Sequence, residues 1–293
     1  MPYVRHWLRY SLLLFATAIA LGMVAAHTRL IQPHDLDLDR TIQTNTRTGW
    51  LNHTMEAVSY CASPVAGVIV LAVWCGWLLF VKRRPITASA VFLVVAVGWN
   101  STQLAKAIVA RPRPPREFML DPEIGSNSFP SGHTAFTVAV ALAVFFLFRE
   151  SRHRRTVAVL GVLAVLLVAF SRMYVGAHYP TDTFGSVLIA SSAVLFVTGV
   201  WHAWLLPRLE TLPVLGGFLG RFGLAEERAA LAAAEQGGHH DDGYYGGPYE
   251  GQYNGQYGGY GEYPGQADPA AGHGRRRAAG PASGGRHRRH AGR

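Results

Sequence analysis

The chain has 293 residues, of which 49% are hydrophobic and only 15% are charged. Soluble domains usually contain about 25% charged residues, so this composition excludes an ordinary soluble domain and favours an integral membrane protein. The net charge of +9 is partly a property of the end of the sequence, where seven arginines lie: Arg275, Arg276, Arg277, Arg286, Arg288, Arg289 and Arg293.

The first apolar run, residues 12–26, follows a short basic segment that contains Arg5 and Arg9. Such a segment is either a cleaved secretory signal or a retained membrane span. The run is long for the apolar part of a signal, which favours a retained span. Residues 27–57 are polar with mixed charge, and we expect them to form an extracytoplasmic loop.

Further apolar runs approach or exceed the ~20 residues that a helix needs to cross a bilayer. With the first run, they predict an all-α, integral membrane helical bundle with about six transmembrane helices. The later spans are predicted at residues 58–81, 86–105, 132–148, 156–170 and 183–206.

Cys61 and Cys75 both fall in the second predicted span, residues 58–81. They are too far apart along a helix for a disulfide, so we expect two buried thiols.

Cations predict the orientation of the bundle. The short turns at residues 82–85 and 149–155 are rich in Lys and Arg, and the positive-inside rule places both in the cytoplasm. Both termini are then cytoplasmic, in a multi-pass protein of the plasma membrane. Arg111, Arg113 and Arg116 break this pattern on the extracytoplasmic side, which indicates a role such as holding an anion.

Three parts follow from these patterns: residues 1–57 with the first span and loop, residues 58–206 as the membrane core, and residues 207–293 as a cytoplasmic tail. The tail is rich in Gly, Tyr and Pro and lacks the aliphatic residues of a core, so we expect it to be disordered. A solvated tail is the favoured interpretation. Self-association through tyrosines and lipid binding through the terminal arginines stay open, and no nucleic-acid partner is expected.

Polar residues interrupt the apolar sequence in three clusters between residues 106 and 182. In the second cluster, Ser131 can cap a helix that begins at Gly132. Such a helix N-terminus binds phosphate through free N–H groups, and Gly132 lets the backbone approach the anion. His133 can protonate a leaving oxygen near neutral pH. The alternative is a helix cap beside an ordinary interfacial histidine.

His178 and Asp182 of the third cluster are four residues apart and share a face of a helix, in whose first turn Pro180 fits. Asp182 can accept a proton from one ring nitrogen of His178 and leave the other free as a nucleophile. Arg172 can grip phosphate oxygens with two N–H groups. A structural pair or a metal site stays open, although a metal needs a third ligand and only His133 offers one.

Lys106 and Arg113 form the first cluster. A lysine at the end of a span often reaches back to the interface, whereas Arg113 lies between two prolines in extended backbone. Taken together, the clusters supply cations, a helix N-terminus, one supported histidine and one further histidine. Phosphoryl transfer needs this set: cations for the oxygens, a nucleophile in line and an acid for the leaving group.

At these residues the chain resembles the type 2 phosphatidic acid phosphatase superfamily, whose soluble relatives include vanadium haloperoxidases. The patterns KxxxxxxRP, PSGH and SRxxxxxHxxxD are matched in order without a substitution, within residues 86–206. The resemblance implies that His178 attacks phosphorus and forms a phosphohistidine, that Asp182 orients it and that His133 protonates the leaving group. The implied phosphate ligands are Lys106, Arg113, Ser131, Gly132 and Arg172, with no metal and no cofactor.

The leading hypothesis is therefore a phosphatase for a membrane lipid phosphate or diphosphate, with its active site on the extracytoplasmic side. Candidate substrates are undecaprenyl diphosphate, phosphatidic acid and phosphatidylglycerol phosphate. Two other hypotheses are kept: vanadate-dependent halide oxidation on the same residues, and a non-catalytic membrane scaffold acting through its tail. Multiple spans and a short chain argue against the first, and the intact motifs argue against the second.

Overall fold

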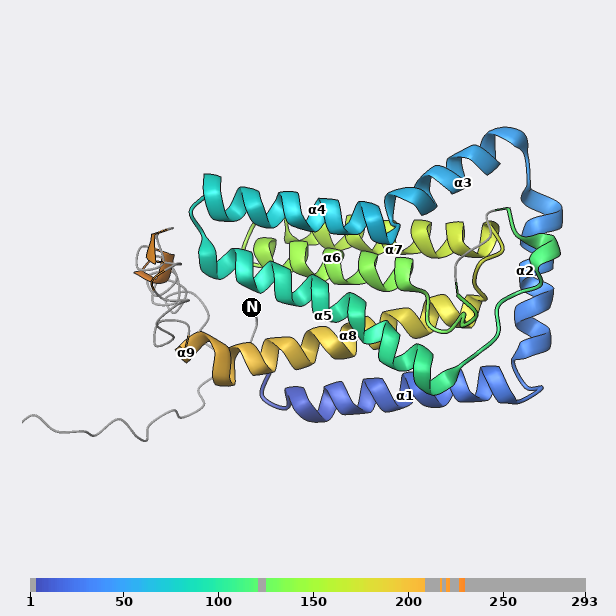
Figure 1. Cartoon of the computed structure of the whole chain (residues 1–293), viewed down its shortest axis with the longest axis horizontal. Coiled ribbons are helices and arrows are strands. Elements are labelled where there is room, and N and C mark those ends of the chain that lie inside the picture. The colour runs from blue at the N-terminus through green and yellow to red at the C-terminus, as the bar shows by residue number, and fades with distance from the viewer. Residues whose placement is uncertain (1–3, 121–124, 209–216, 218–219, 222–226, 230–293) are drawn as a thin grey trace, which may run out of the picture. The chain divides into compact units, whose positions relative to one another are not determined.

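The computed structural model describes residues 4–120, 125–208, 217, 220–221 and 227–229. Their regular elements are all helices, which confirms the all-α prediction (Figure 1). The predicted disordered tail lies largely outside these residues. The elements are α1 (Trp7–His27), α2 (Gln32–Thr46), α3 (Gly49–Cys61), α4 (Pro64–Gly76), η1 (Trp77–Val81), α5 (Pro85–Val109), η2 (Arg116–Phe118), α6 (Gly132–Phe148), α7 (Arg154–Tyr174), α8 (Pro180–Val200), η3 (Trp201–Leu205) and α9 (Leu206–Arg208).

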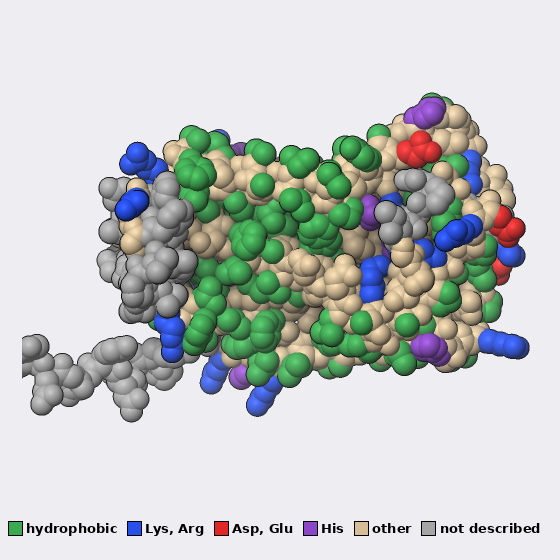
Figure 2. All heavy atoms as spheres, viewed as in Figure 1, with side chains coloured by type: hydrophobic (Ala, Val, Ile, Leu, Met, Phe, Trp, Pro, Cys, Tyr) green, Lys and Arg blue, Asp and Glu red, His purple; other side chains and the backbone are tan. Residues whose placement is uncertain are grey.

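Five of these helical segments are long and apolar enough to cross a membrane: α1, α4 with η1, α5, α7, and α8 with its continuation to Arg208. Helix α6 is equally apolar but has only 17 residues. Hydrophobic side chains cover the middle of the visible face, while most charged ones gather towards its two ends (Figure 2). The chain is therefore a multi-pass membrane protein, and six spans is an approximate number.

Helices α5 to α8 follow one another in alternating directions (Figure 1). The end of α5, the start of α6, the end of α7 and the start of α8 consequently meet at one end of the bundle. The basic turns between α4 and α5 and between α6 and α7 lie at the other end. Helix α1 packs along α8, and α2 lies across the end where the three polar clusters are found.

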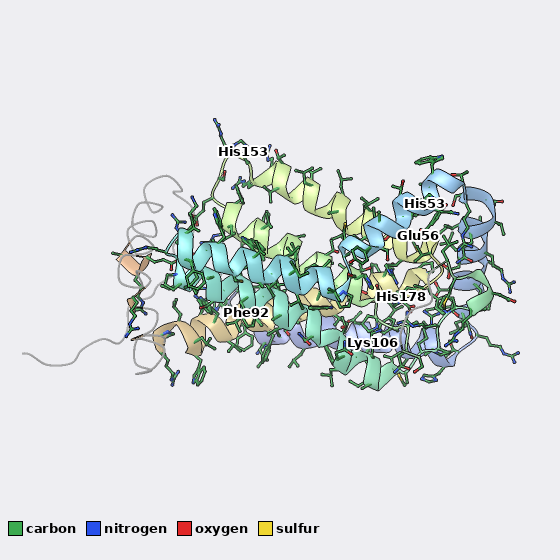
Figure 3. All side chains as sticks on the ribbon, turned by 45° about the horizontal axis from the view of Figure 1, so that its top comes forward. His53, Glu56, Phe92, Lys106, His153 and His178 are labelled. Carbon is green, nitrogen blue, oxygen red and sulfur yellow. The ribbon has the colours of Figure 1, made fainter. Side chains whose placement is uncertain are left out.

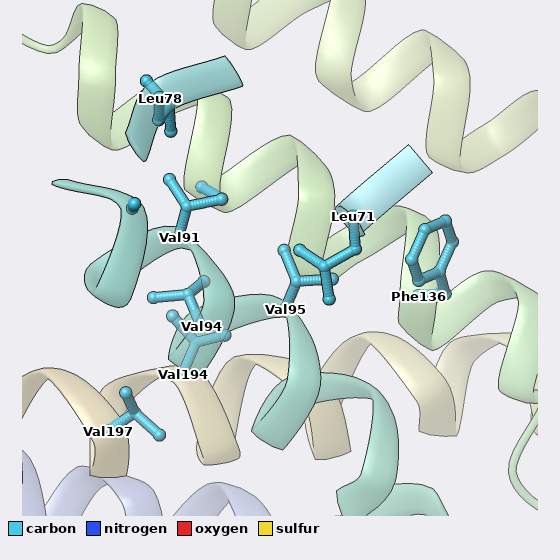
Figure 4. Packing of buried hydrophobic residues seen from close by; sticks show 10 residues of the cluster. Leu71, Leu78, Val91, Val94, Val95, Phe136, Val194 and Val197 are labelled. Carbon is cyan, nitrogen blue, oxygen red and sulfur yellow. The ribbon is translucent and has the colours of Figure 1, made fainter. Parts of the chain in front are cut away.

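A core of aliphatic side chains joins α4, α5, α6 and α8 (Figure 4). Gly98 lets α5 approach its neighbours, because a Cβ built on it would lie 2.8 Å from the Cβ of Ala139 and 3.3 Å from Cγ2 of Val194. The packing of these helices therefore depends on the absence of a side chain at this position. The central residues of the core are Leu71, Leu78, Val91, Val94, Val95, Phe136, Val194 and Val197.

The expectation of a polar loop over residues 27–57 is wrong, because the segment forms α2 and α3. Helix α2 has Pro33 in its first turn and buries Asp35, Asp39 and Gln43, which are four residues apart. This spacing places them on one helical face. The buried face is polar, so the hydropathy of the sequence gave no signal of a packed helix.

The second span begins at Pro64 and not near residue 58. Ser63 caps α4, since its side chain accepts a hydrogen bond from the N–H of Ala66, and Pro64 occupies the first helical position. The two cysteines are therefore in different helices, contrary to the prediction. Cys61 is exposed and Cys75 half-buried, so the expectation of two buried thiols is also wrong.

The fifth predicted span, residues 156–170, is too short at both ends, since α7 runs from Arg154 to Tyr174. Ser171, which follows the predicted span, is helical, and its hydroxyl donates to the carbonyl of Val168 within the same helix. Arg172 is consequently held on the last turn of α7. The first span is likewise longer than predicted, Trp7–His27 in place of residues 12–26.

We predict that Gly98→Ala lowers the free energy of unfolding by about 1–3 kcal/mol, because the new methyl group forces α5 and α6 apart. The measurement is thermal unfolding in detergent. Gly49→Ala is the matched control, since nothing lies within 4 Å of its Cβ position and Ala is otherwise the better helix residue. Equal stability of the two variants would contradict the close approach at Gly98.

Candidate active site

The site lies where α5, α6, α7 and α8 meet, and His178 is at its centre. The side chain of His178 is 1% exposed. Its backbone belongs to the short turn between α7 and α8, in which Gly176 adopts a positive φ of 79°. The N–H groups of Ala177 and His178 both donate to the carbonyl of Arg172, at 3.0 and 3.3 Å. His178 and Lys106 lie towards the same end of the bundle, whereas His153 lies at the opposite end (Figure 3).

Asp182 lies in the first turn of α8, which begins at Pro180. Its Oδ2 is 3.5 Å from Nδ1 of His178 and accepts a hydrogen bond of 2.9 Å from the N–H of Tyr179. His178 precedes this helix, so the two residues do not share a helical face as predicted, but the carboxylate is still directed at one ring nitrogen. That arrangement suits a proton held on Nδ1, which leaves Nε2 as the nitrogen with a lone pair.

Cations surround the other side of the ring. Nη1 of Arg113 is 3.4 Å from Nε2 of His178 and donates to the carbonyl of Ala177. Burial lowers the pKa of His178 well below its ordinary value, and Arg172, Arg113, Lys106 and His133 lower it further by charge repulsion. The imidazole is therefore neutral at neutral pH.

Lys106, in the last turn of α5, contacts the loop that follows this helix. Its ammonium group donates to the carbonyl of Asn127 at 2.9 Å, in the loop between α5 and α6. The side chain amide of Asn127 donates in return to the carbonyl of Lys106. This exchange holds the lysine beside the loop that leads to Ser131, on the same side as His178.

Ser131 caps α6 as its sequence predicts, since its side chain accepts a hydrogen bond of 3.4 Å from the N–H of Thr134. The N–H of Ser131 donates to the carbonyl of Asp182 at 3.3 Å, which ties the start of α6 to the start of α8. A Cβ on Gly132 would meet one atom within 4 Å, Nε1 of Trp99 at 3.8 Å. Packing therefore does not require a glycine at position 132.

Two residues linked to Asp182, Arg111 and Asp35, were not predicted as members of the site. Arg111 is 1% exposed, and its guanidinium binds Oδ1 of Asp182 at 2.8 Å and Oδ2 of Asp35 at 2.7 Å. The sequence signal for Arg111 was a cation retained against the positive-inside rule, which did not separate it from Arg113 and Arg116. Asp35 gave no signal, because its segment was interpreted as a loop.

A third carboxyl group, Asp39, is buried one turn along α2. Burial raises its pKa to about 8, and the charges of Asp182 and Asp35 add to the effect. The described part of the chain holds no group of three or more His, Cys, Asp or Glu placed to bind a metal ion. The alternative of a metal bound by His133, His178 and Asp182 is therefore not formed there.

Comparison with known proteins gives the family. The PAP2 superfamily matches residues 85–205. Phosphatidylglycerophosphatase B of Bacillus subtilis (strain 168) is 27% identical over 194 residues, 64% of this chain and 92% of the relative. Undecaprenyl-diphosphatase BcrC of the same organism is 30% identical over 146 residues, 48% of this chain and 69% of the relative.

The same fold is found in the crystal structure of a transmembrane PAP2 type phosphatidylglycerolphosphate phosphatase from Bacillus subtilis. The TM-score is 0.58 at 25% sequence identity, with 67% of this chain and 97% of that chain covered. The chain belongs to the PAP2 superfamily, which confirms the resemblance carried by the three motifs. It is a membrane-embedded phosphatase of that superfamily.

Proposed function

We propose that the protein hydrolyses a lipid phosphate or diphosphate through a phosphohistidine on His178. The observation that carries the proposal is the two-sided environment of this buried ring. A carboxylate, Asp182, faces Nδ1, and a guanidinium, Arg113, faces Nε2. A nucleophile needs a free lone pair directed at phosphorus, and the phosphoryl oxygens need cations around that same nitrogen.

In the first step, Nε2 of His178 attacks phosphorus while the bond from phosphorus to the leaving oxygen breaks. His133 gives its proton to that oxygen, and Asp182 stabilises the positive charge that forms on the His178 ring. In the second step, water attacks the phosphohistidine and the P–N bond breaks. His133 takes the proton from the water, which returns both histidines to their starting states and releases phosphate.

The oxygens of the transferred group are held by charges and donors that converge on the ring. Nη1 of Arg113 lies 3.4 Å from Nε2, and Arg172 and Lys106 also act on the ring by charge. The start of α6 adds a helix N-terminus, whose free N–H groups favour an anion. The proposed phosphate ligands are Lys106, Arg113, Ser131, Gly132 and Arg172.

An open groove supports a substrate with a hydrocarbon chain. It has a volume of about 690 Å³, lies between α3, α6 and α7, and is lined mainly by apolar side chains. Two lining residues, Thr137 and Val168, are one helical turn from His133 and Arg172. A chain in this groove would therefore bring its phosphate head to the cations. The substrate classes that we propose are undecaprenyl diphosphate, phosphatidic acid and phosphatidylglycerol phosphate.

We also propose that the site faces the extracytoplasmic side of the plasma membrane, with both termini in the cytoplasm. The support is the charge pattern of the turns: Lys82, Arg83 and Arg84 precede α5, and further arginines lie between α6 and α7. Both turns are at the end opposite the site. The positive-inside rule places such turns in the cytoplasm.

His178→Ala is predicted to abolish phosphate release, because the phosphohistidine cannot form without the ring. The measurement is release of inorganic phosphate from a panel of the three lipid classes, in detergent with excess EDTA. His153→Ala is the matched control, since His153 is exposed and lies at the other end of the bundle. Turnover by His178→Ala, or a strict need for a divalent metal, would contradict the mechanism.

The pH dependence of kcat/KM tests the charge state of His178. Its lowered pKa keeps the ring neutral until the pH falls below the ordinary value of about 6.5. Activity should therefore persist through this pH and be lost only at lower pH. Arg113→Gln removes a positive charge, raises the pKa of His178 and should move the acid limb to higher pH. The substrate ionises identically with the wild type and with Arg113→Gln, so it cannot cause a difference between their pH profiles. An acid limb at the same pH in both enzymes would contradict its assignment to His178.

Filling the groove should separate long-chain from short-chain substrates. Ala57 lines the groove and is exposed, so Ala57→Trp occupies the space without disturbing the core. We predict that KM rises about tenfold for a long-chain lipid phosphate, because the substrate loses the burial of roughly two methylene groups. The KM of a short-chain lipid phosphate should change little. Ala72→Trp, on an exposed face of α4 outside the groove, is the control. An equal change for both chain lengths would place the hydrocarbon elsewhere.

A further inference from the structure

A buried arginine connects the helix that lies across the end of the bundle to the proposed catalytic carboxylate. Arg111 follows the end of α5, where Ala110 has a left-handed backbone with φ of 50°. Its guanidinium donates from Nη1 to Asp182 at 2.8 Å and from Nη2 to Asp35 at 2.7 Å. The side chains of all three residues are 5% exposed or less. One cation is therefore shared between a carboxylate of α2 and a carboxylate of α8.

Further hydrogen bonds fix this arrangement at the first turn of α8. The hydroxyl of Thr181 accepts from Nη1 of Arg111 and donates to Oδ2 of Asp35. The N–H of Thr181 donates to Oδ1 of Asp35 at 3.4 Å. The ring of Tyr179 lies beneath the guanidinium, with Cζ of Arg111 4.1 Å from its centroid. Asp35 therefore contacts both the arginine and the backbone that carries Asp182.

The two oxygens of Asp182 have different partners as a result. Oδ1 is held by Arg111, and Oδ2 accepts from the N–H of Tyr179 and faces His178. A carboxylate fixed at both oxygens has one orientation, and the ring that it faces is oriented in turn. Asp35 binds Nη2 of the guanidinium, whereas Asp182 binds Nη1. Two carboxylates fix the orientation of the guanidinium better than one.

Asp39 does not replace Asp35 in this role. It lies one turn further along the same face of α2, but its pKa is raised to about 8, chiefly by burial. At neutral pH it is mostly protonated and carries little charge to offer a guanidinium. Asp35 is therefore the carboxylate of α2 that balances the charge of Arg111.

We propose that Asp35 is a positioning residue for the hydrolysis: it holds Arg111, Arg111 holds Asp182, and Asp182 orients His178. The inference rests on the function proposed above. Asp35 lies outside residues 85–205, over which the family is matched, so the support for the reactive histidine extends into the N-terminal part of the chain.

A purely structural role for Asp35 would be to fasten α2 to the bundle. Other contacts already do this. The side chain of Gln43 donates to the carbonyl of Met173 at 3.4 Å, and Arg47, which follows α2, donates to the carbonyl of Tyr174 at 3.0 Å. Loss of the Asp35 carboxylate should therefore leave α2 in place and act on the turnover step.

The test is a double-mutant cycle in the full-length protein, with Asp35→Asn, Asp182→Asn and both together. A ³²P-labelled short-chain lipid phosphate keeps slow variants measurable. Asp35→Asn should lower kcat by about 10–100-fold, the range for a residue that orients a reactive group, and leave KM within about twofold. In the Asp182→Asn background it should cost no further activity, because it acts through Asp182. Asp37→Asn, an exposed position on the same helix, should match the wild type.

If the fold-loss of kcat in the double variant equals the product of the losses in the two single variants, the proposal is overturned. It is also overturned if Asp35→Asn has the same kcat as Asp37→Asn. If Asp35→Asn does not yield folded protein, the same cycle is run with Thr181→Val, which removes the hydroxyl between Asp35 and Arg111 and keeps the shape of the side chain. Its loss of kcat should also vanish in the Asp182→Asn background, and a loss that persists there overturns the proposal.

The two proposals fail in different ways. An active His178→Ala enzyme would refute the proposed function itself. An inactive His178→Ala enzyme together with a fully active Asp35→Asn enzyme would refute the positioning role alone.

Discussion

The ion pair between Arg111 and Asp182 is the contact on which the polar end of the bundle depends. It joins the segment that leaves α5 to the first turn of α8, and both groups are almost completely buried. Buried charges are costly unless geometry and further hydrogen bonds compensate them. Asp35, Thr181 and Tyr179 supply that compensation. The charge of Arg111 therefore contacts the helix that carries Asp35 as well as the carboxylate at the start of α8.

The electrostatics of His178 and the binding of phosphate have a common origin. Arg113, Arg172 and Lys106 lower the pKa of the ring by repelling its protonated form. In the reaction that we propose, the same three cations also attract a phosphoryl group to the ring. An excess of positive charge around a neutral imidazole thus serves both requirements of the proposed reaction. The negative charge of Asp182 does not cancel it locally, because Arg111 lies against that carboxylate.

The sequence predicted the elements whose signals are local. Apolar runs predicted α1 and α4 to α8, and the spacing of His178 and Asp182 predicted their contact, although His178 precedes the helix that carries Asp182. It did not predict α2, whose buried face consists of Asp35, Asp39 and Gln43 and so lacks apolar periodicity. Arg111 was noticed as a cation but not placed, because its partners lie 71 and 76 residues away along the chain.

The part of the chain that precedes the family match contributes to both sides of the site. On one side, Asp35 lies behind Asp182 through Arg111. On the other, Arg172 donates to the hydroxyl of Ser59 on α3, and the same helix forms one wall of the groove. In the function that we propose, the residues of the three motifs bind the phosphate, which all the proposed substrates share. If the hydrocarbon lies in the groove, discrimination between lipid chains belongs to α3 and its neighbours, where the motifs give no information.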